Sequence, residues 1–332
     1  NNNWSASLTS NYRLGPNHVF TVNNVFNSFK RTNENMLNTP PSKDEISKVT
    51  SKNIIGISYR YAPDTKMNFS VFGKYYHQYV AGPIATSAAQ DNYVHTSRSD
   101  NYAGYGAAGT LFLPGGIQLK ASYEKALRMP TIEEMFGNED LETGDISLKP
   151  ESSHNMNLNL SYNATFGNNI IYVEAGVIYR DTRDYIQRNI MSLSGGKFAA
   201  SYTNYGKVRT GGLSLSARYN FSKWLSVGGN FTQMNVRDNM RTAINNTAAN
   251  VSYRQRMPNL PYMFADTDAS FYWAGLGRKD NTLTLTYDNQ YTHSFCYYAS
   301  NLGSNSNDYM VPDQFAHNLA ISYGIMGGKY NI

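Results

Sequence analysis

The chain of 332 residues lacks several features that would assign it to a common class. Its single cysteine, Cys296, cannot form an internal disulfide, and no Cys-x-x-Cys or histidine-rich ligand spacing is present. No apolar run approaches the roughly 18 residues of a membrane-spanning helix. The net charge of +5 is small and no basic run accompanies it, so the sequence does not indicate nucleic-acid binding. These absences exclude a disulfide scaffold, a helical membrane protein and a nucleic-acid-binding module.

Charged residues are also scarce, whereas aromatic residues are common. Charged residues make up 16% of the chain, against roughly 25% in soluble domains. Aromatic residues make up 14%, including 27 tyrosines. Apolar and polar side chains alternate strictly over residues 117–124 and again over 155–162. Such an alternation predicts strands with one apolar and one wet face.

The same alternation recurs along the chain and predicts a succession of hairpins with short turns rich in Gly, Pro, Asn and Ser. The expected strands are Trp4–Leu14 and His18–Asn27, Lys52–Tyr61 and Met67–Tyr79, Asn101–Leu113 and Ile117–Lys125, Ser152–Thr165 and Ile170–Asp181, Ala200–Tyr219 and Leu225–Val236, Met263–Trp273 and Asn281–Thr292, and Phe315–Tyr323 as the start of a seventh hairpin. Longer connections, 28–51, 80–100, 126–151, 182–199, 237–262 and 293–314, separate the hairpins. All the long connections therefore fall on one side of the predicted sheet.

This layout favours an all-β transmembrane antiparallel barrel with short periplasmic turns and long extracellular loops. Most expected strands reach the about 9–11 residues that a tilted membrane strand needs. Charges in mid-strand, such as Arg218, Glu174 and Asp288, fall on the polar face and are expected to face the lumen, because a charge facing hydrocarbon is costly. Leucines on the other face, Leu158, Leu160, Leu213, Leu215, Leu283 and Leu285, are expected to face lipid. A soluble β-sandwich also alternates, but its strands are shorter.

No enzymatic constellation is present. The six histidines are scattered, and neither a G-x-S-x-G nor an H-E-x-x-H motif occurs. We therefore expect a protein that is not an enzyme and that carries no cofactor and no metal site.

Residues 127–151, LRMPTIEEMFGNEDLETGDISLKPE, join two long strands and carry a family resemblance. Arg128-Met129-Pro130-Thr131-Ile132-Glu133-Glu134-Met135-Phe136, followed by Leu148-Lys149-Pro150-Glu151, resembles the junction of TonB-dependent outer-membrane receptors of the siderophore and vitamin type. Two further stretches, 202–232 and 256–273, resemble the same family. The resemblance covers nearly the whole chain.

The resemblance implies a barrel of about 22 strands filled by an N-terminal plug, of which residues 1–332 would supply about 13–14 strands. The plug and the final strand or strands are expected to lie outside this chain. The implied function is TonB-dependent import of a scarce ligand, such as a ferric siderophore, across the outer membrane of a Gram-negative bacterium. The implied partners are outer-membrane lipid and lipopolysaccharide, TonB acting through the plug, and a small-molecule ligand. The alternatives are a passive porin and a glycan- or cobalamin-importing receptor.

The long loops are the expected binding surface, because function concentrates on loops held by a rigid scaffold. Arginine and tyrosine together suit an anionic, aromatic ligand such as a ferric chelate. The candidate ligand-binding residues are Arg128, Glu133, Phe136, His77, His95, Arg183, Arg188, Arg237, Arg241, Tyr253, Tyr297 and Tyr298. These loops could instead contact lipopolysaccharide.

Two interpretations of the junction remain open. Arg128 could clamp the loop by pairing with Glu133 or Glu134, while Pro130 fixes the direction in which the strand exits. Such a clamp predicts that Phe136→Ala has little effect on stability. Alternatively, the junction holds Met135 and Phe136 over the mouth of the lumen to contact the ligand.

Overall fold

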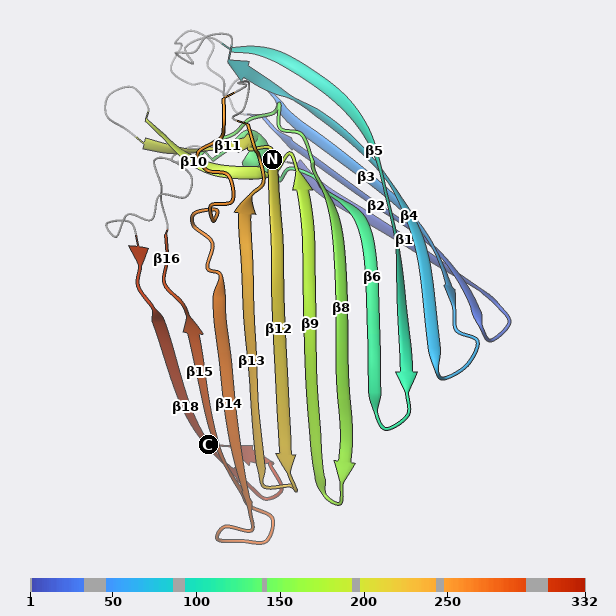
Figure 1. Cartoon of the computed structure of the whole chain (residues 1–332), viewed down its shortest axis with the longest axis vertical. Helices are drawn as coiled ribbons and strands as arrows, with labels where there is room; N and C mark the ends of the chain where they lie inside the picture. The colour runs from blue at the N-terminus through green and yellow to red at the C-terminus, as the bar shows by residue number, and fades with distance from the viewer. Residues whose placement is uncertain are drawn as a thin grey trace. The chain divides into compact units, whose positions relative to one another are not determined.

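The computed structural model describes residues 2–32, 46–85, 93–138, 142–192, 198–242, 248–296 and 310–331. Fourteen strands form one sheet in the order β1-β2-β3-β4-β5-β6-β8-β9-β12-β13-β14-β15-β18-β19 (Figure 1). Sheet neighbours follow one another in sequence except where the short strands β7, β10, β11, β16 and β17 intervene. An all-β, antiparallel sheet is therefore confirmed.

The strands are long, as the alternation predicted. The main sheet consists of β1 (Asn2–Leu14), β2 (His18–Arg31), β3 (Lys48–Tyr61), β4 (Met67–Ala85), β5 (Tyr93–Leu113), β6 (Ile117–Arg128), β8 (Glu151–Phe166), β9 (Asn169–Arg183), β12 (Lys207–Phe221), β13 (Leu225–Asp238), β14 (Met263–Ala274), β15 (Thr282–Thr292), β18 (Gln314–Ile325) and β19 (Tyr330–Asn331). Within the described ranges, no helix is long and apolar enough to cross a membrane.

Three of the expected elements differ from the structure. The predicted strand Ala200–Tyr219 is broken at Tyr205 and Gly206 into β11 (Phe198–Asn204) and β12, because Gly206 adopts a positive φ of 116°. The junction, predicted as a plain loop, contains the helix α1 (Ile132–Phe136) and the short strand β7 (Glu142–Thr143). A further strand, β10 (Ile186–Ser192), lies in a connection that was expected to be irregular.

The chain divides into two compact units. The first comprises Asn1–Gly109, Tyr123–Asn155 and Asp181–Lys207, and the second comprises Thr110–Ser122, Met156–Arg180 and Val208–Ile332. In the second unit, β12, β13, β14, β15 and β18 run side by side in alternating directions (Figure 1). The short strands β16 (Phe295–Cys296) and β17 (Met310–Val311) pair with each other beyond the ends of β15 and β18.

The register of the second unit separates an apolar from a polar face. Leu215 lies opposite Phe231, which in turn lies opposite Ala265, so this face is apolar across three strands. Leu215 is 43% exposed. On the polar face, Asp268 lies directly opposite Asp288.

The leucines that were expected to face lipid are exposed, apart from Leu283, which is half-buried. This exposure is what a lipid-facing surface requires. Arg218, Asp268 and Asp288 lie on the opposite face, as predicted for charges in mid-strand.

Candidate functional site

In the first unit, the residues between the long strands form a small body of their own. We call this body the loop cluster and define it as residues 129–138, 142–150, 185–192 and 198–206. β10 pairs antiparallel with β11, and β11 pairs in parallel with β7 through Ala200–Glu142 and Ser201–Thr143. Segments far apart in the sequence, about residues 142 and 200, are thereby joined into one three-stranded sheet.

The helix α1 begins with a reciprocal cap. Thr131 Oγ1 accepts a hydrogen bond from the backbone N–H of Glu134, and the Glu134 carboxylate accepts one from the N–H of Thr131, at 3.2 and 2.8 Å. Such a capping box satisfies two otherwise unpaired donors and fixes where the helix starts. At its end, Gly144 packs backbone against backbone, because a Cβ there would lie 2.4 Å from the nitrogens of Phe136 and Gly137. The helix is therefore held tightly at both ends.

Arg128 joins four elements through its guanidinium group. Its Nη1 donates to the Glu134 carboxylate at 3.0 and 3.1 Å, and its Nη2 donates to Glu151 Oε1 at 3.0 Å. The same Glu151 oxygen accepts the backbone N–H of Ile186 at 2.9 Å. The ends of β6, α1, β8 and β10 are thus connected by charge-assisted bonds. The carboxylate partners are Glu134 and Glu151, whereas Glu133 is exposed.

Two further basic side chains hold the junction from the long strands. Lys52 of β3 donates its ammonium group to the carbonyl of Pro130. Arg98 of β5 donates to the carbonyl of Ser147 at 2.8 Å and also to that of Leu148. Neither residue was recognised from the sequence, because each sits inside an ordinary strand pattern and only the fold brings it to the loop.

An apolar core lies beneath these polar contacts. Val80, Met135, Phe136 and Ile146 form a buried cluster, with Phe29 packed against it. Met135 and Phe136 are 1% and 7% exposed, and the rings of Phe29 and Phe136 are 6.0 Å apart. This geometry supports the clamp interpretation. Met135 and Phe136 are thus both buried in this cluster, and both also line a pocket.

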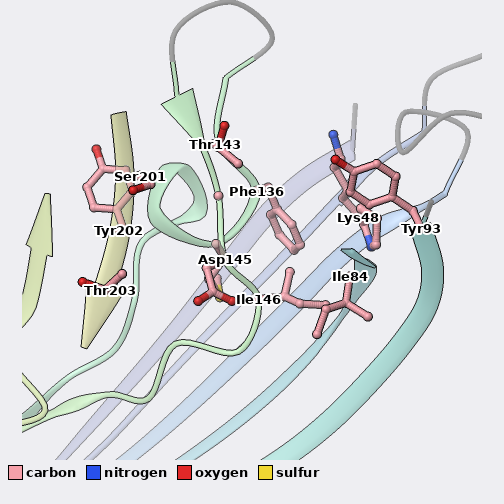
Figure 2. Close-up of a pocket in the computed structure, with 13 residues that line it drawn as sticks. Lys48, Ile84, Tyr93, Phe136, Thr143, Asp145, Ile146, Ser201, Tyr202 and Thr203 are labelled. Carbon is pink, nitrogen blue, oxygen red and sulfur yellow. The ribbon is translucent and has the colours of Figure 1, made fainter. Parts of the chain in front are cut away.

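That pocket has a volume of about 310 Å³ and lies between the loop cluster and the ends of β3, β4 and β5 (Figure 2). Its polar lining residues are Lys48, Tyr93, Thr143, Asp145, Ser201, Tyr202 and Thr203, and its other lining residues are Pro83, Ile84, Met135, Phe136, Gly144 and Ile146. The volume lies at the lower end of the about 300–1,000 Å³ typical of small-molecule sites. No local pattern in the sequence indicates this pocket, because its walls come from five separate stretches.

Next to the pocket, the Glu142 carboxylate accepts hydrogen bonds from two side chains. Glu142 Oε1 accepts from the Tyr202 hydroxyl at 3.2 Å and from Arg188 Nε at 3.4 Å. Burial, together with the negative charge of Glu142, raises the pKa of the Tyr202 phenol. The phenol therefore remains a hydrogen-bond donor over a wider pH range than a free tyrosine. Arg188, a predicted site residue, is tied to this carboxylate and is half exposed.

In the second unit, the connection between β13 and β14 carries a separate cluster of arginines. Arg237 Nη1 donates to the carbonyl of Arg254 at 2.8 Å, and the Arg254 guanidinium lies 5.3 Å from the centre of the Tyr253 ring. The side chains of Arg241 and Arg254 lower the pKa of the Tyr253 phenol. Two predicted site residues, Arg241 and Tyr253, therefore lie together on this loop, and a third, Arg237 at the end of β13, bonds the loop backbone at Arg254.

A buried carboxylate supports that loop. Asp238 is 2% exposed and accepts hydrogen bonds from the backbone N–H of Met240 at 2.8 Å and from Asn250 Nδ2 at 2.6 Å. It also accepts the N–H of Arg254 through its backbone carbonyl at 2.9 Å. The arginines beside it remain at the surface, so the described part of this loop presents a positive surface.

The histidines are spread along the strands. His77 lies two residues after Tyr75 on β4, and both side chains bond the Oδ1 of Asn101. His95 is exposed on β5. Four other histidines bond tyrosine hydroxyls, in the pairs His18–Tyr59, His154–Tyr123, His293–Tyr291 and His317–Tyr287. The placement of His77 and His95 does not bring them into the pocket or the arginine loop.

The remaining predicted site residues are less informative. Arg183 is exposed at the end of β9. Tyr297 and Tyr298 lie outside the described residues. In the part of the chain that the structure describes, no three His, Cys, Asp or Glu side chains gather in a way that could hold a metal ion.

Solved structures with this fold are numerous. The chain superposes on the copper transporter OprC with a TM-score of 0.70 at 13% identity, covering 97% of this chain and 48% of OprC. It superposes on the ferric-catecholate import receptor Fiu of Escherichia coli K12 with a TM-score of 0.63 at 13% identity, covering 97% and 48%. For the iron transporter FrpB of Neisseria meningitidis, the TM-score is 0.68 at 11% identity, covering 98% and 48%. The chain thus spans about half the length of these proteins.

At these identities the superpositions establish the fold alone. No curated protein matches the chain in sequence. The family model for the TonB dependent receptor-like beta-barrel, however, matches residues 1–331. The chain therefore belongs to the TonB-dependent receptor family, whose members are outer-membrane proteins, and the match is to the β-barrel of that family.

Proposed function

We propose that this chain forms part of the wall and the outer loops of a barrel of about 22 strands that imports a scarce ligand across the bacterial outer membrane using TonB. The observation that carries the proposal is the family match over residues 1–331, together with a loop cluster that is latched rigidly to the strands. A rigid frame with polar loops at its end is the usual arrangement of a binding surface. A plug domain would supply the contact with TonB.

The proposed ligand is an anionic metal chelate, such as a ferric siderophore. Two features support this choice. The loop between β13 and β14 places Arg241 and Arg254 beside Tyr253, and Arg237 at the end of β13 bonds the backbone of that loop, which suits a ligand with acidic oxygens and flat rings. The similar proteins named above are a copper transporter, a ferric-catecholate import receptor and an iron transporter.

The test is uptake of an iron-labelled ferric catecholate by cells that carry this protein, with and without a functional TonB. The expected result is accumulation that requires both the protein and TonB. The matched variants are Arg241→Gln, in the arginine loop, and Arg209→Gln, on the neighbouring strand β12. Arg241→Gln should reduce uptake, and Arg209→Gln should leave it unchanged. Equal accumulation in cells that lack TonB would show a passive channel instead.

A further inference from the structure

Three polar side chains lie together at the end of β15 and β18 where the connection between these strands leaves the sheet. Tyr291 is near the end of β15, His293 follows that strand, and Asp313 directly precedes β18. The two strands pair side by side, with Thr292 opposite Gln314 (Figure 1). This pairing brings Tyr291 and Asp313, which are 22 residues apart in the sequence, to one corner of the sheet.

The donor atoms of the three side chains have the spacing of metal ligands. The hydroxyl oxygen of Tyr291 lies 2.7 Å from His293 Nδ1, and Asp313 Oδ1 lies 3.0 Å from the same nitrogen. The third distance, between the Tyr291 and Asp313 oxygens, is 3.5 Å. An ion with bonds of about 2.0–2.2 Å at angles of about 90–110° holds neighbouring donor atoms about 2.8–3.6 Å apart. Small movements therefore suffice to place an ion between the three atoms.

The chemistry of the three groups suits a transition-metal ion. Imidazole nitrogen and carboxylate oxygen are common ligands of Zn²⁺, and imidazole also favours Cu²⁺. The His293 nitrogen carries one proton or one lone pair, which it must share between two oxygens, so hydrogen bonding alone serves this cluster poorly. A cation contacts all three donors at once, and its binding releases the phenol proton to water.

Neighbouring groups orient the proposed ligands. Asp313 Oδ1 accepts the backbone N–H of Ser294 at 2.6 Å, which fixes the carboxylate. The Tyr262 ring packs edge-on against the His293 ring, with the ring centres 5.1 Å apart. The side chains of His293 and Asp313 nevertheless remain 28% and 45% exposed. An ion can therefore enter from solvent and keep water in its remaining coordination positions.

Another histidine on the same strand pair provides an internal comparison. His317 Nδ1 lies 2.9 Å from the Tyr287 hydroxyl, much as His293 lies beside Tyr291, but its second neighbour is Asn289 Nδ2 at 3.0 Å. An amide nitrogen carries no negative charge and donates hydrogen bonds rather than accepting them. The position at His317 therefore has the histidine and the tyrosine of the cluster without its carboxylate.

We propose that Tyr291, His293 and Asp313 bind one divalent transition-metal ion, with Cu²⁺ held more tightly than Zn²⁺. Along β15, Tyr291 shares a face with Leu285, whereas Asp288 lies on the other face. The site is therefore at the end of the apolar face and is not part of the polar face proposed to line the lumen. It does not depend on the import of a metal chelate.

The test uses the detergent-purified protein without a histidine tag, because a tag would itself bind these ions. Calorimetric titration with Zn²⁺ should show one ion per chain, and the paramagnetic resonance spectrum of added Cu²⁺ should show one nitrogen ligand. His293→Ala and Asp313→Asn should each weaken binding at least about 10-fold, since changes beside a metal ligand already cost that much. Tyr291→Phe keeps the ring but removes the oxygen, so it should also abolish the visible phenolate-to-copper absorption.

His317→Ala is the matched control, because it removes a histidine that contacts a tyrosine in the same way but has no carboxylate beside it. It should bind both ions as the wild type does. The absence of saturable binding of either ion overturns the proposal and leaves the cluster as an ion pair with a structural role. Binding that is unchanged in folded His293→Ala, Asp313→Asn and Tyr291→Phe also overturns it, as does an equal loss in His317→Ala. Circular dichroism of the β-sheet establishes that the variants are folded.

Discussion

The loop cluster buries its apolar side chains, whereas the long strands of the second unit expose theirs. In the loop cluster, Met135 and Leu148 are each 1% exposed. On β8 and β12, by contrast, Leu158 and Leu215 are 47% and 43% exposed and point away from the polar face. The loop cluster packs like a small soluble domain, whereas the strands leave apolar area for a surrounding apolar medium to cover. One chain thus combines a buried apolar core with an exposed apolar face.

The ion pairs differ in the same way. Arg128 is bound by two carboxylates whose side chains are 12% and 5% exposed. Arg218 binds Asp268 with two bonds of 2.7 and 2.9 Å, but these side chains are 44% and 31% exposed. Solvent screens the second pair much more than the first, so similar geometry should give unequal energies. The comparison predicts that the same chemical change has different costs in the two regions.

The largest effect is expected for Phe136→Ala. Removing a buried phenyl ring from the core of the loop cluster should cost about 3–5 kcal/mol of that region's stability. The expectation that Phe136→Ala has little effect on stability conflicts with a side chain that is only 7% exposed. Hydrogen exchange of the loop-cluster amides measures the change. The control, Phe166→Ala, removes a ring that is 58% exposed and should leave those amides protected. Equal loss of protection in both variants would contradict the separate core.

A charge on the apolar face should be nearly as costly. Leu215→Arg places a guanidinium where the strand is proposed to meet lipid, and should cost about 2–4 kcal/mol in a bilayer. Ser216→Arg is the matched control, because Ser216 lies on the polar face and bonds Asn230 at 2.7 Å. Reversible urea unfolding in lipid vesicles measures both variants. If the two substitutions cost the same, the assignment of the two faces would be wrong.

The part of this contrast that concerns the strands could be predicted from the sequence. Alternation is a local signal, and it located thirteen of the strands because the side-chain period of two is visible in any window of eight residues. The clamp of Arg128 on a glutamate could also be predicted, because both partners lie within one short segment. The start of α1 was not predicted, although Thr131 and Glu134 have the spacing of a capping box.

The rest depends on contacts that no local pattern contains. The break at Gly206 is stabilised by Asn204, whose side chain bonds the N–H and the carbonyl of Lys149, 55 residues earlier, at 2.8 and 2.9 Å. The pairing of Ser201 with Thr143, and the contact of Lys52 with Pro130, likewise arise only once the sheet has formed. The pocket is made of such contacts, which is why the sequence did not reveal it.

A third prediction concerns the buried ion pairs. Arg128→Ala leaves Glu134 and Glu151 without their partner, and should cost about 2–3 kcal/mol after allowance for its partial exposure. Arg128→Lys keeps the charge but cannot bond both carboxylates in the forked geometry, so its cost should be intermediate. Urea unfolding, combined with hydrogen exchange at the loop cluster, measures these losses. If Arg128→Ala lowered the stability less than Arg128→Lys does, the clamp would not contribute to the stability of the junction.

The exposed pair should matter less. Arg218→Ala is expected to cost about 0.2–1 kcal/mol, the usual contribution of a surface ion pair. Gly228 lies beneath this pair, and a Cβ there would come within 2.5 Å of Arg218 Nη2. Gly228→Ala should therefore displace the guanidinium at a similarly small cost. Raising the salt concentration should reduce the effect of Arg218→Ala and leave that of Arg128→Ala largely unchanged. If the effects of both substitutions depended equally on salt, the two ion pairs would not differ in how strongly solvent screens them.

The smallest effect is expected in the titration of Tyr253. Arg241 and Arg254 lower the pKa of its phenol, so it should ionise below the ordinary value of about 10. Because the folded pKa is the lower one, any resulting stabilisation is fully present above the ordinary pKa and fades as the pH falls through the lowered value.

The measurement for Tyr253 is the difference between the ultraviolet titrations of the wild type and of Tyr253→Phe, which isolates one phenol among 27 tyrosines. Arg241→Gln should move this titration back toward the ordinary value. The control is Arg237→Gln, because Arg237 bonds the carbonyl of Arg254 rather than the phenol. This change should have the weaker effect. If the titration of Tyr253 does not respond to Arg241→Gln, the arginine loop does not act on its phenol, and the argument for an anionic ligand at that loop would lose this support.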